Sequence, residues 1–120
     1  MADELTISAN SLTFLKNSIG DDFEVAEKLV LINGQRFIRH VQLISTSGEL
    51  LEIGELGTLG HILIVNRDAT HYVTIRMGAG GADVVRINPG ESARFRFAGN
   101  TPYLVAELSA CYVEYFLVED

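Results

Sequence analysis

The ten residues Asn88–Phe97, which read NPGESARFRF, decide the fold class. Asn88-Pro89-Gly90-Glu91 fits a type II turn, because proline presets φ at the first central position and glycine supplies the positive φ needed at the second. The six residues that follow alternate between apolar and polar: Ala93, Phe95 and Phe97 are predicted to face the core, and Ser92, Arg94 and Arg96 to face outward. A period of two indicates a strand with one buried face. A turn joined directly to such a strand is typical of an antiparallel sheet.

The same rhythm of short apolar runs and turn signals continues in both directions from this stretch. Gly20-Asp21-Asp22 is predicted to be a turn. Asn33-Gly34 separates the apolar runs within Phe23–Ile32 and Gln35–Ser45, and Asn-Gly between two such runs is the strongest short hairpin signal. We therefore expect an all-β fold, an antiparallel and jelly-roll-like β-sandwich of about nine or ten short strands.

The length of 120 residues fits one domain. Residues 1–18 are predicted to form an N-terminal arm or edge strands, which add a strand to another subunit. Residues 19–120 are predicted to form the single β-sandwich domain.

The formal net charge of −7 argues against nucleic-acid binding, which requires lysine and arginine to neutralise phosphates. No apolar run is long enough to span a bilayer, so no membrane partner is expected. Cys111 is the single cysteine, so no disulfide can form within the chain. Five arginines gather between residues 66 and 97, where a locally basic face is one reading and solvated strand faces are the other: Arg67, Arg76, Arg86, Arg94 and Arg96.

The sequence contains no pattern that predicts chemistry. The three histidines do not pair at a metal-ligand spacing, and the Glu49, Glu52 and Glu55 series is interpreted as a solvated acidic face rather than a Ca²⁺ site. The chain lacks the Gly-x-Ser-x-Gly pattern of a nucleophile elbow. We expect no enzyme activity, no catalytic residues, no bound metal and no cofactor.

The aromatic residues near the C-terminus indicate a binding surface instead. Tyr112 and Phe116 share one face of the strand predicted at Cys111–Val118, and Tyr115 lies on the other. Core packing covers one face, and a partner subunit is a candidate to cover the second. The predicted interface residues are Leu5, Ile7, Arg94, Arg96, Tyr103, Tyr112 and Tyr115.

The chain from Ile53 onward resembles a group of small all-β virion proteins encoded among the structural genes of tailed bacteriophages. The motifs that carry the resemblance are the glycine-rich run Ile53–Gly60, the segment Asn66–Thr70 (NRDAT), the Pro89-Gly90-Glu91 turn and the ending Val113–Asp120. Arg67 departs from the pattern, which usually has an apolar residue there. These motifs mark turns and strands and carry no catalytic residues.

The resemblance implies a protein of the phage particle, assembled in the host cytoplasm. The expected function is a capsid decoration or cement protein that stabilises the head shell, with the major capsid protein and further copies of itself, as a homotrimer, for partners. One alternative is a tail, baseplate or receptor-binding component. A second alternative is a small carbohydrate- or metal-binding β module.

Overall fold

A computed structural model describes residues 4–7, 10–16, 19–25 and 28–31 by their backbone, and residues 36–76, 78–97 and 101–120 with their side chains. The chain divides into two compact units, Met1–Asn33 and Gly34–Asp120. All regular elements in the described residues are strands, and there are twelve of them. The expected all-β class is confirmed.

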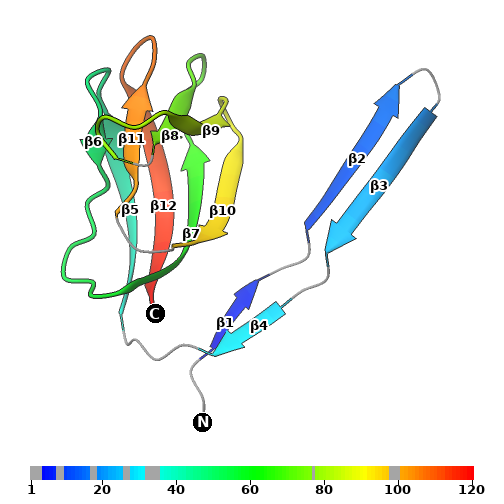
Figure 1. The fold of residues 1–120 in the computed structure, drawn as a ribbon, viewed down its shortest axis with the longest axis horizontal. Coiled ribbons are helices and arrows are strands. Elements are labelled where there is room, and N and C mark those ends of the chain that lie inside the picture. Colours follow the sequence, from blue (N-terminus) through cyan, green and yellow to red (C-terminus); the bar gives the residue numbers. More distant parts are fainter. Residues whose placement is uncertain are drawn as a thin grey trace. The chain divides into compact units, whose positions relative to one another are not determined.

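The first unit consists of two antiparallel strand pairs (Figure 1). β1 (Glu4–Ile7) pairs with β4 (Lys28–Leu31), and β2 (Asn10–Lys16) pairs with β3 (Ile19–Val25). Glu4 faces Leu31 and Asn10 faces Val25, so the two pairs continue one register without a slip.

This register corrects two expectations. Gly20-Asp21-Asp22 is not a turn, because these residues lie inside β3 and Gly20 faces Leu15. The chain divides after Asn33 rather than after residue 18, because the strands on either side of residue 18 pair with each other.

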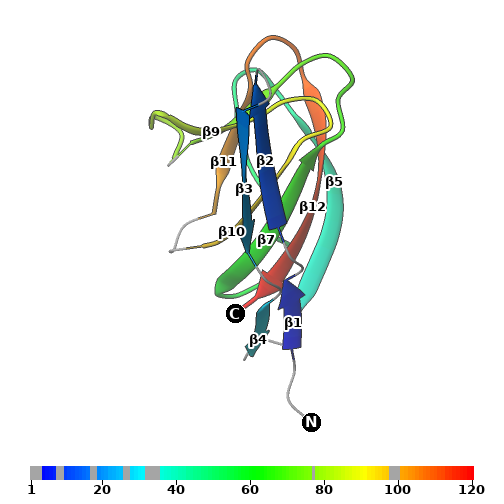
Figure 2. The same cartoon turned by 90° about the vertical axis from the view of Figure 1, so that its right-hand side faces the viewer.

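The second unit contains eight strands in two antiparallel sheets (Figures 1 and 2). One sheet has the order β10-β7-β12-β5, formed by Ser92–Arg96, Leu59–Asn66, Cys111–Glu119 and Phe37–Ile44. The other has the order β6-β11-β8-β9, formed by Glu49–Leu50, Tyr103–Ala106, Val73–Arg76 and Asp83–Ile87. Within the second unit, only β8 and β9 follow each other in the same sheet. Each of the remaining connections takes the chain from one sheet to the other. This connectivity is that of an eight-stranded jelly roll.

The core lies between the two sheets, because alternate residues of each strand point inward. β5, β7 and β12 contribute Ile44, Ile62, Ile64, Val113, Tyr115 and Leu117, and the facing strands contribute Val73, Ile75, Ile87, Leu104 and Ala106. Ala93 and Phe95 of β10 pack against this cluster, as the alternation in Ser92–Phe97 predicts.

The two local turn predictions have different outcomes. Gly90 has a φ of 78°, and the Glu91 amide donates to the Asn88 carbonyl at 2.9 Å, which confirms the predicted turn. The Asn33-Gly34 turn lies outside the described residues, but the predicted hairpin around it is wrong. β4 pairs with β1 and β5 pairs with β12, so the strands on either side of this dipeptide have different partners.

A loop runs beside β5, the edge strand of its sheet, and is tied to it by side chains. Gln42 donates to the Leu50 carbonyl at 3.0 Å and accepts from the Glu52 amide at 2.9 Å. His40 lies 2.9 Å from the Glu52 carboxylate. Covering an edge with a loop limits uncontrolled pairing with other strands, so the β5 edge of this sheet is protected.

Candidate interaction surface

The outer face of the β10-β7-β12-β5 sheet carries an unusual number of exposed apolar side chains. The same alternation that sends Ile44, Val113 and Leu117 into the core sends their sequence neighbours outward. Six of the exposed large hydrophobic residues lie on this face: Phe37, Val41, Leu43, Leu63, Tyr112 and Phe116. Phe37 is 64% exposed and Tyr112 is 55% exposed, so these side chains are not buried within the second unit.

The strand register brings these side chains together. Tyr112 faces Leu43 of β5, and Phe116 faces Leu63 of β7. The rings of Phe37 and Phe116 stack with their centroids 5.4 Å apart. Neighbours on one face of adjacent strands lie close enough to interact, so the apolar residues of this face form local contacts such as the Phe37–Phe116 stack.

Glu114 lies in the middle of this surface and binds two arginines. Arg39 Nε donates to Glu114 Oε2 at 2.9 Å, and Arg67 donates to Oε1 through Nε at 3.0 Å and Nη2 at 2.8 Å. The guanidinium groups of Arg67 and then Arg39 hold the pKa of the Glu114 carboxyl below its ordinary value. One carboxylate serves two guanidinium groups, so this trio carries a net positive charge.

A hollow of about 260 Å³ opens on the surface beside this trio. Its walls are the three charged residues together with apolar Leu63, Val65 and Phe116. It can accept a side chain from a partner that combines an apolar contact with an acidic group.

The basic character of this face extends to β10. Arg94 faces Leu63 of β7 and Arg96 faces His61 of β7, on the outer side of the sheet. Arg96 also forms an ion pair with Asp120 at 2.8 Å. Three of these arginines, Arg39, Arg67 and Arg96, share the two acids Glu114 and Asp120, in a chain whose net charge is −7. Of the five arginines between residues 66 and 97, Arg67, Arg94 and Arg96 belong to this face, whereas Arg76 and Arg86 lie on β8 and β9 of the other sheet.

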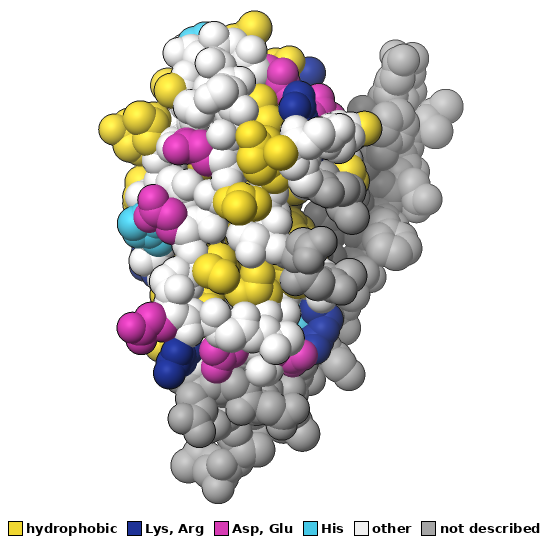
Figure 3. All heavy atoms as spheres, turned by 60° about the vertical axis from the view of Figure 1, so that its left-hand side comes forward, with side chains coloured by type: hydrophobic (Ala, Val, Ile, Leu, Met, Phe, Trp, Pro, Cys, Tyr) yellow, Lys and Arg dark blue, Asp and Glu magenta, His cyan; other side chains and the backbone are white. Residues whose placement is uncertain are grey.

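Figure 3 shows a different side of the molecule, where hydrophobic side chains reach the surface in several patches and most acidic and basic groups lie towards the edges of the view. On the outer face of the β10-β7-β12-β5 sheet, the rings of Phe37 and Phe116 stack directly.

The predicted interface residues fall in different places. Tyr112 lies on the apolar face, and Arg94 and Arg96 lie on β10, two strands away from β12 in the same sheet. Tyr115 is 1% exposed, and its hydroxyl donates to the Glu52 carbonyl and to Gln42, so its assignment to an interface is wrong. Tyr103 is half-buried, and its hydroxyl donates to the Ser47 carbonyl. Leu5 and Ile7 lie in β1 of the first unit, where they face Val30 and Lys28.

Sequence reasoning missed several residues of the surface: Phe37, Arg39, Val41, Leu43, Leu63 and Glu114. It named Phe116 and Arg67 but did not include them among the interface residues. A signal was present for Arg67, because it departs from the apolar residue usual in the resembling proteins. In this structure its charge is used to bind Glu114.

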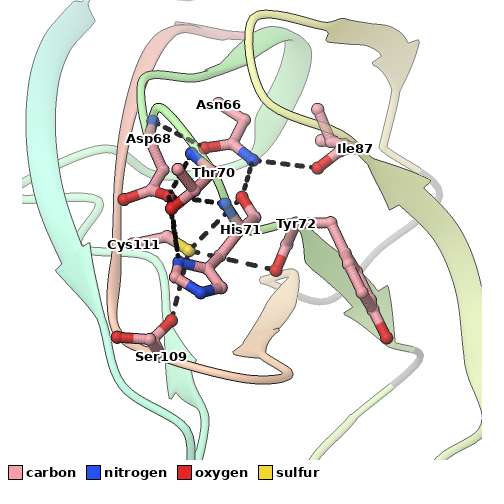
Figure 4. A network of polar contacts seen from close by, with 8 residues as sticks. All are labelled: Asn66, Asp68, Thr70, His71, Tyr72, Ile87, Ser109 and Cys111. Carbon is pink, nitrogen blue, oxygen red and sulfur yellow. Dashed lines mark hydrogen bonds and ion pairs between the residues drawn. The ribbon is translucent and has the colours of Figure 1, made fainter.

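A second polar cluster lies at the NRDAT segment (Figure 4). Asn66 donates to the carbonyls of His71 and Ile87 at 2.9 and 3.0 Å, and its Oδ1 accepts from the Asp68 amide. Asp68 Oδ2 in turn accepts from the amides of Thr70 and His71. These bonds satisfy backbone groups of a loop, so the motif fixes a chain path.

Cys111 lies next to this cluster and has the environment of a structural thiol. Its Sγ lies 3.2 Å from the Ser109 carbonyl and 3.6 Å from the His71 carbonyl (Figure 4). Burial raises the pKa of the thiol, and the thiolate is the reactive form. The arrangement favours an unreactive cysteine.

Among the described residues, no three histidine, cysteine, aspartate or glutamate side chains gather to hold a metal ion. The described part of the chain also has no helix of the length and apolarity that crossing a membrane requires. Comparison with protein-family models, curated proteins and solved structures finds no match.

Proposed function

We propose that this chain is a structural protein of a tailed bacteriophage particle, a decoration or cement protein that stabilises the head shell by binding to its surface. The observation that carries the proposal is the apolar, arginine-bearing outer face of the β10-β7-β12-β5 sheet. The turn and strand motifs that resemble small phage virion proteins supply the setting.

The composition of the face supports a role in protein binding. Tyrosine, phenylalanine and arginine are enriched at the centres of protein interfaces, where few residues carry most of the binding free energy. Tyr112, Phe116 and Arg39 lie on adjacent strands β12 and β5. Six large apolar side chains exposed on one face of a sheet favour an interaction site there.

The charge of the face supports an acidic partner. A chain with a net charge of −7 is repelled by an acidic surface at long range, and the cluster of arginines is the local exception. Association should therefore depend on orientation, because only the arginine-bearing face is complementary to an acidic surface. An acidic, apolar patch on the shell-forming capsid protein fits these requirements.

The test uses particles of the phage whose genome encodes this chain, prepared without it, and the purified full chain added back. Sedimentation of particles with bound protein measures the affinity. Phe116→Ser and Arg67→Glu should each weaken binding by at least about tenfold, which is the effect of losing roughly 1.4 kcal/mol at an interface centre. Val84→Ser is the matched control, because Val84 is 60% exposed but lies on β9 of the other sheet.

Unchanged binding by both variants of the face would refute its role. Localisation decides between head and tail: cryo-EM density for this chain only in the tail or baseplate would replace the decoration role with a tail role.

A further inference from the structure

The β2–β3 pair of the first unit has two chemically different faces. Facing residues of antiparallel strands share a face, and neighbours along a strand alternate. The register therefore places Asn10, Leu12, Phe14, Lys16, Ile19, Asp21, Phe23 and Val25 on one face, which we call the apolar face of the pair. The other face contains Ser11, Thr13, Leu15, Gly20, Asp22 and Glu24.

The contrast between the faces is large. Five of the eight residues on the apolar face are large and hydrophobic, against Leu15 alone on the other face. The other face carries two acids, Asp22 and Glu24, and no base. Apolar contact is therefore available on one face only.

β2 and β3 form a two-stranded sheet among the described residues. A two-stranded sheet is marginally stable in water, and it needs packing on its apolar face to persist. Something must therefore cover this face.

The two charged residues on the apolar face indicate which partner packs against it. Lys16 faces Ile19 and Asp21 faces Phe14, so the face carries one positive and one negative charge in adjacent rows. When two such faces pack with their Lys16 ends together, β2 of each copy lies over β3 of the other. Lys16 of one copy is then offset from Asp21 of the next by two residues, roughly 7 Å along the strand, with the packed sheets about 10 Å apart, so the two oppositely charged positions are near neighbours across the contact.

We propose that the β2–β3 pair is an oligomerisation element, whose apolar face packs against the same face of another copy of this chain. Lys16 of each copy pairs with Asp21 of its neighbour. This pairing selects the orientation in which the Lys16 ends of the two strand pairs lie together. The inference goes beyond the proposed function, because it holds whether or not the sheet face of the second unit binds a phage shell.

The charge pair allows a test in which two defective variants restore each other. In Lys16→Glu the apolar face carries two negative charges, and in Asp21→Lys two positive charges, so each variant alone should run as a monomer in size-exclusion chromatography with light scattering. An equimolar mixture of the two full-length variants should recover the mass of the wild-type oligomer, because their faces are complementary again. A contact between Lys16 and Asp21 of one chain cannot produce recovery on mixing.

Leu12→Ser combined with Phe23→Ser, a facing pair on the apolar face, should also give monomers, and Leu15→Ser on the other face should keep the oligomer. Near-ultraviolet circular dichroism checks in each case that the second unit remains folded. A monomeric wild-type chain at micromolar concentration, or mixtures that stay monomeric, would overturn the proposal.

Discussion

The backbone of Gly48 lies against the ring of Tyr103. A Cβ atom at Gly48 would approach Tyr103 Cε1 to 2.4 Å, which is closer than real atoms come. Gly48 also has a φ of 89°, in the region that favours glycine. Because the Tyr103 hydroxyl donates to the Ser47 carbonyl at 2.9 Å, the ring is held in place over the turn that follows β5.

Gly48→Ala should destabilise the second unit by about 2 kcal/mol or more, because the new methyl group displaces the Tyr103 ring and strains the backbone. Gly80→Ala is the control, since a Cβ there meets nothing within 4 Å. Its effect should stay within about 0.5 kcal/mol. Urea unfolding of both full-length variants measures the difference, and equal stabilities would show that Tyr103 moves aside without cost.

Asn66→Ala should be among the most destabilising substitutions outside the apolar core. Asn66 is fully buried and donates to the His71 and Ile87 carbonyls, which lose their partner when the amide is removed. Unpaired buried carbonyls cost about 1–3 kcal/mol each, so a loss of about 2–4 kcal/mol is expected in denaturant unfolding. A loss below about 1 kcal/mol would mean that water replaces the amide.

Tyr115 should make stability depend on pH in the alkaline range. Burial, followed by the nearby Glu52 charge, raises the pKa of Tyr115 to about 12 from an ordinary value of 10. The folded state holds the proton more tightly, so this contribution is complete below pH 10 and is lost as the pH rises towards 12. Tyr115→Phe should remove that pH dependence.

The same variant should lose about 1–2 kcal/mol at neutral pH, because the Glu52 carbonyl then lacks a donor. Unfolding curves at pH 7, 9 and 11 separate the two effects. Parallel stability profiles for the wild type and Tyr115→Phe above pH 10 would contradict the assignment.

The Cys111 thiol should react slowly with a disulfide reagent in the native protein. Burial raises its pKa and shields Sγ, so labelling requires opening of the structure. The rate should rise steeply when urea is added, and the unfolded chain should react at once. Rapid stoichiometric labelling of the native chain at pH 8 would show that the site is accessible.

The sequence predicted features whose cause is local. The Asn88–Glu91 turn depends on Pro89 and Gly90 themselves, so four residues were enough to predict it. The Asn33-Gly34 hairpin was mispredicted because strand pairing depends on distant partners. β5 finds β12, whose residues lie at the far end of the sequence.

The candidate surface shows a similar limit. Alternation correctly separated Tyr112 and Phe116 from Tyr115, but both sets are aromatic, and a period of two does not tell which face is buried. Tyr115 lies on the buried face, where its hydroxyl donates to the side chain of Gln42. A polar residue in the core and apolar residues on the surface are the reverse of what hydrophobicity alone predicts.

The position of β12 has a consequence for synthesis. It lies between β7 and β5, so these earlier strands have no common neighbour until Cys111–Glu119 has left the ribosome. A nascent chain that stops at Ala110 contains two separated halves of a sheet, with the apolar residues of both exposed to proteases and chaperones. The sheet can therefore form only after this segment has been synthesised. Prematurely terminated chains should be degraded by the cell before they join any assembly.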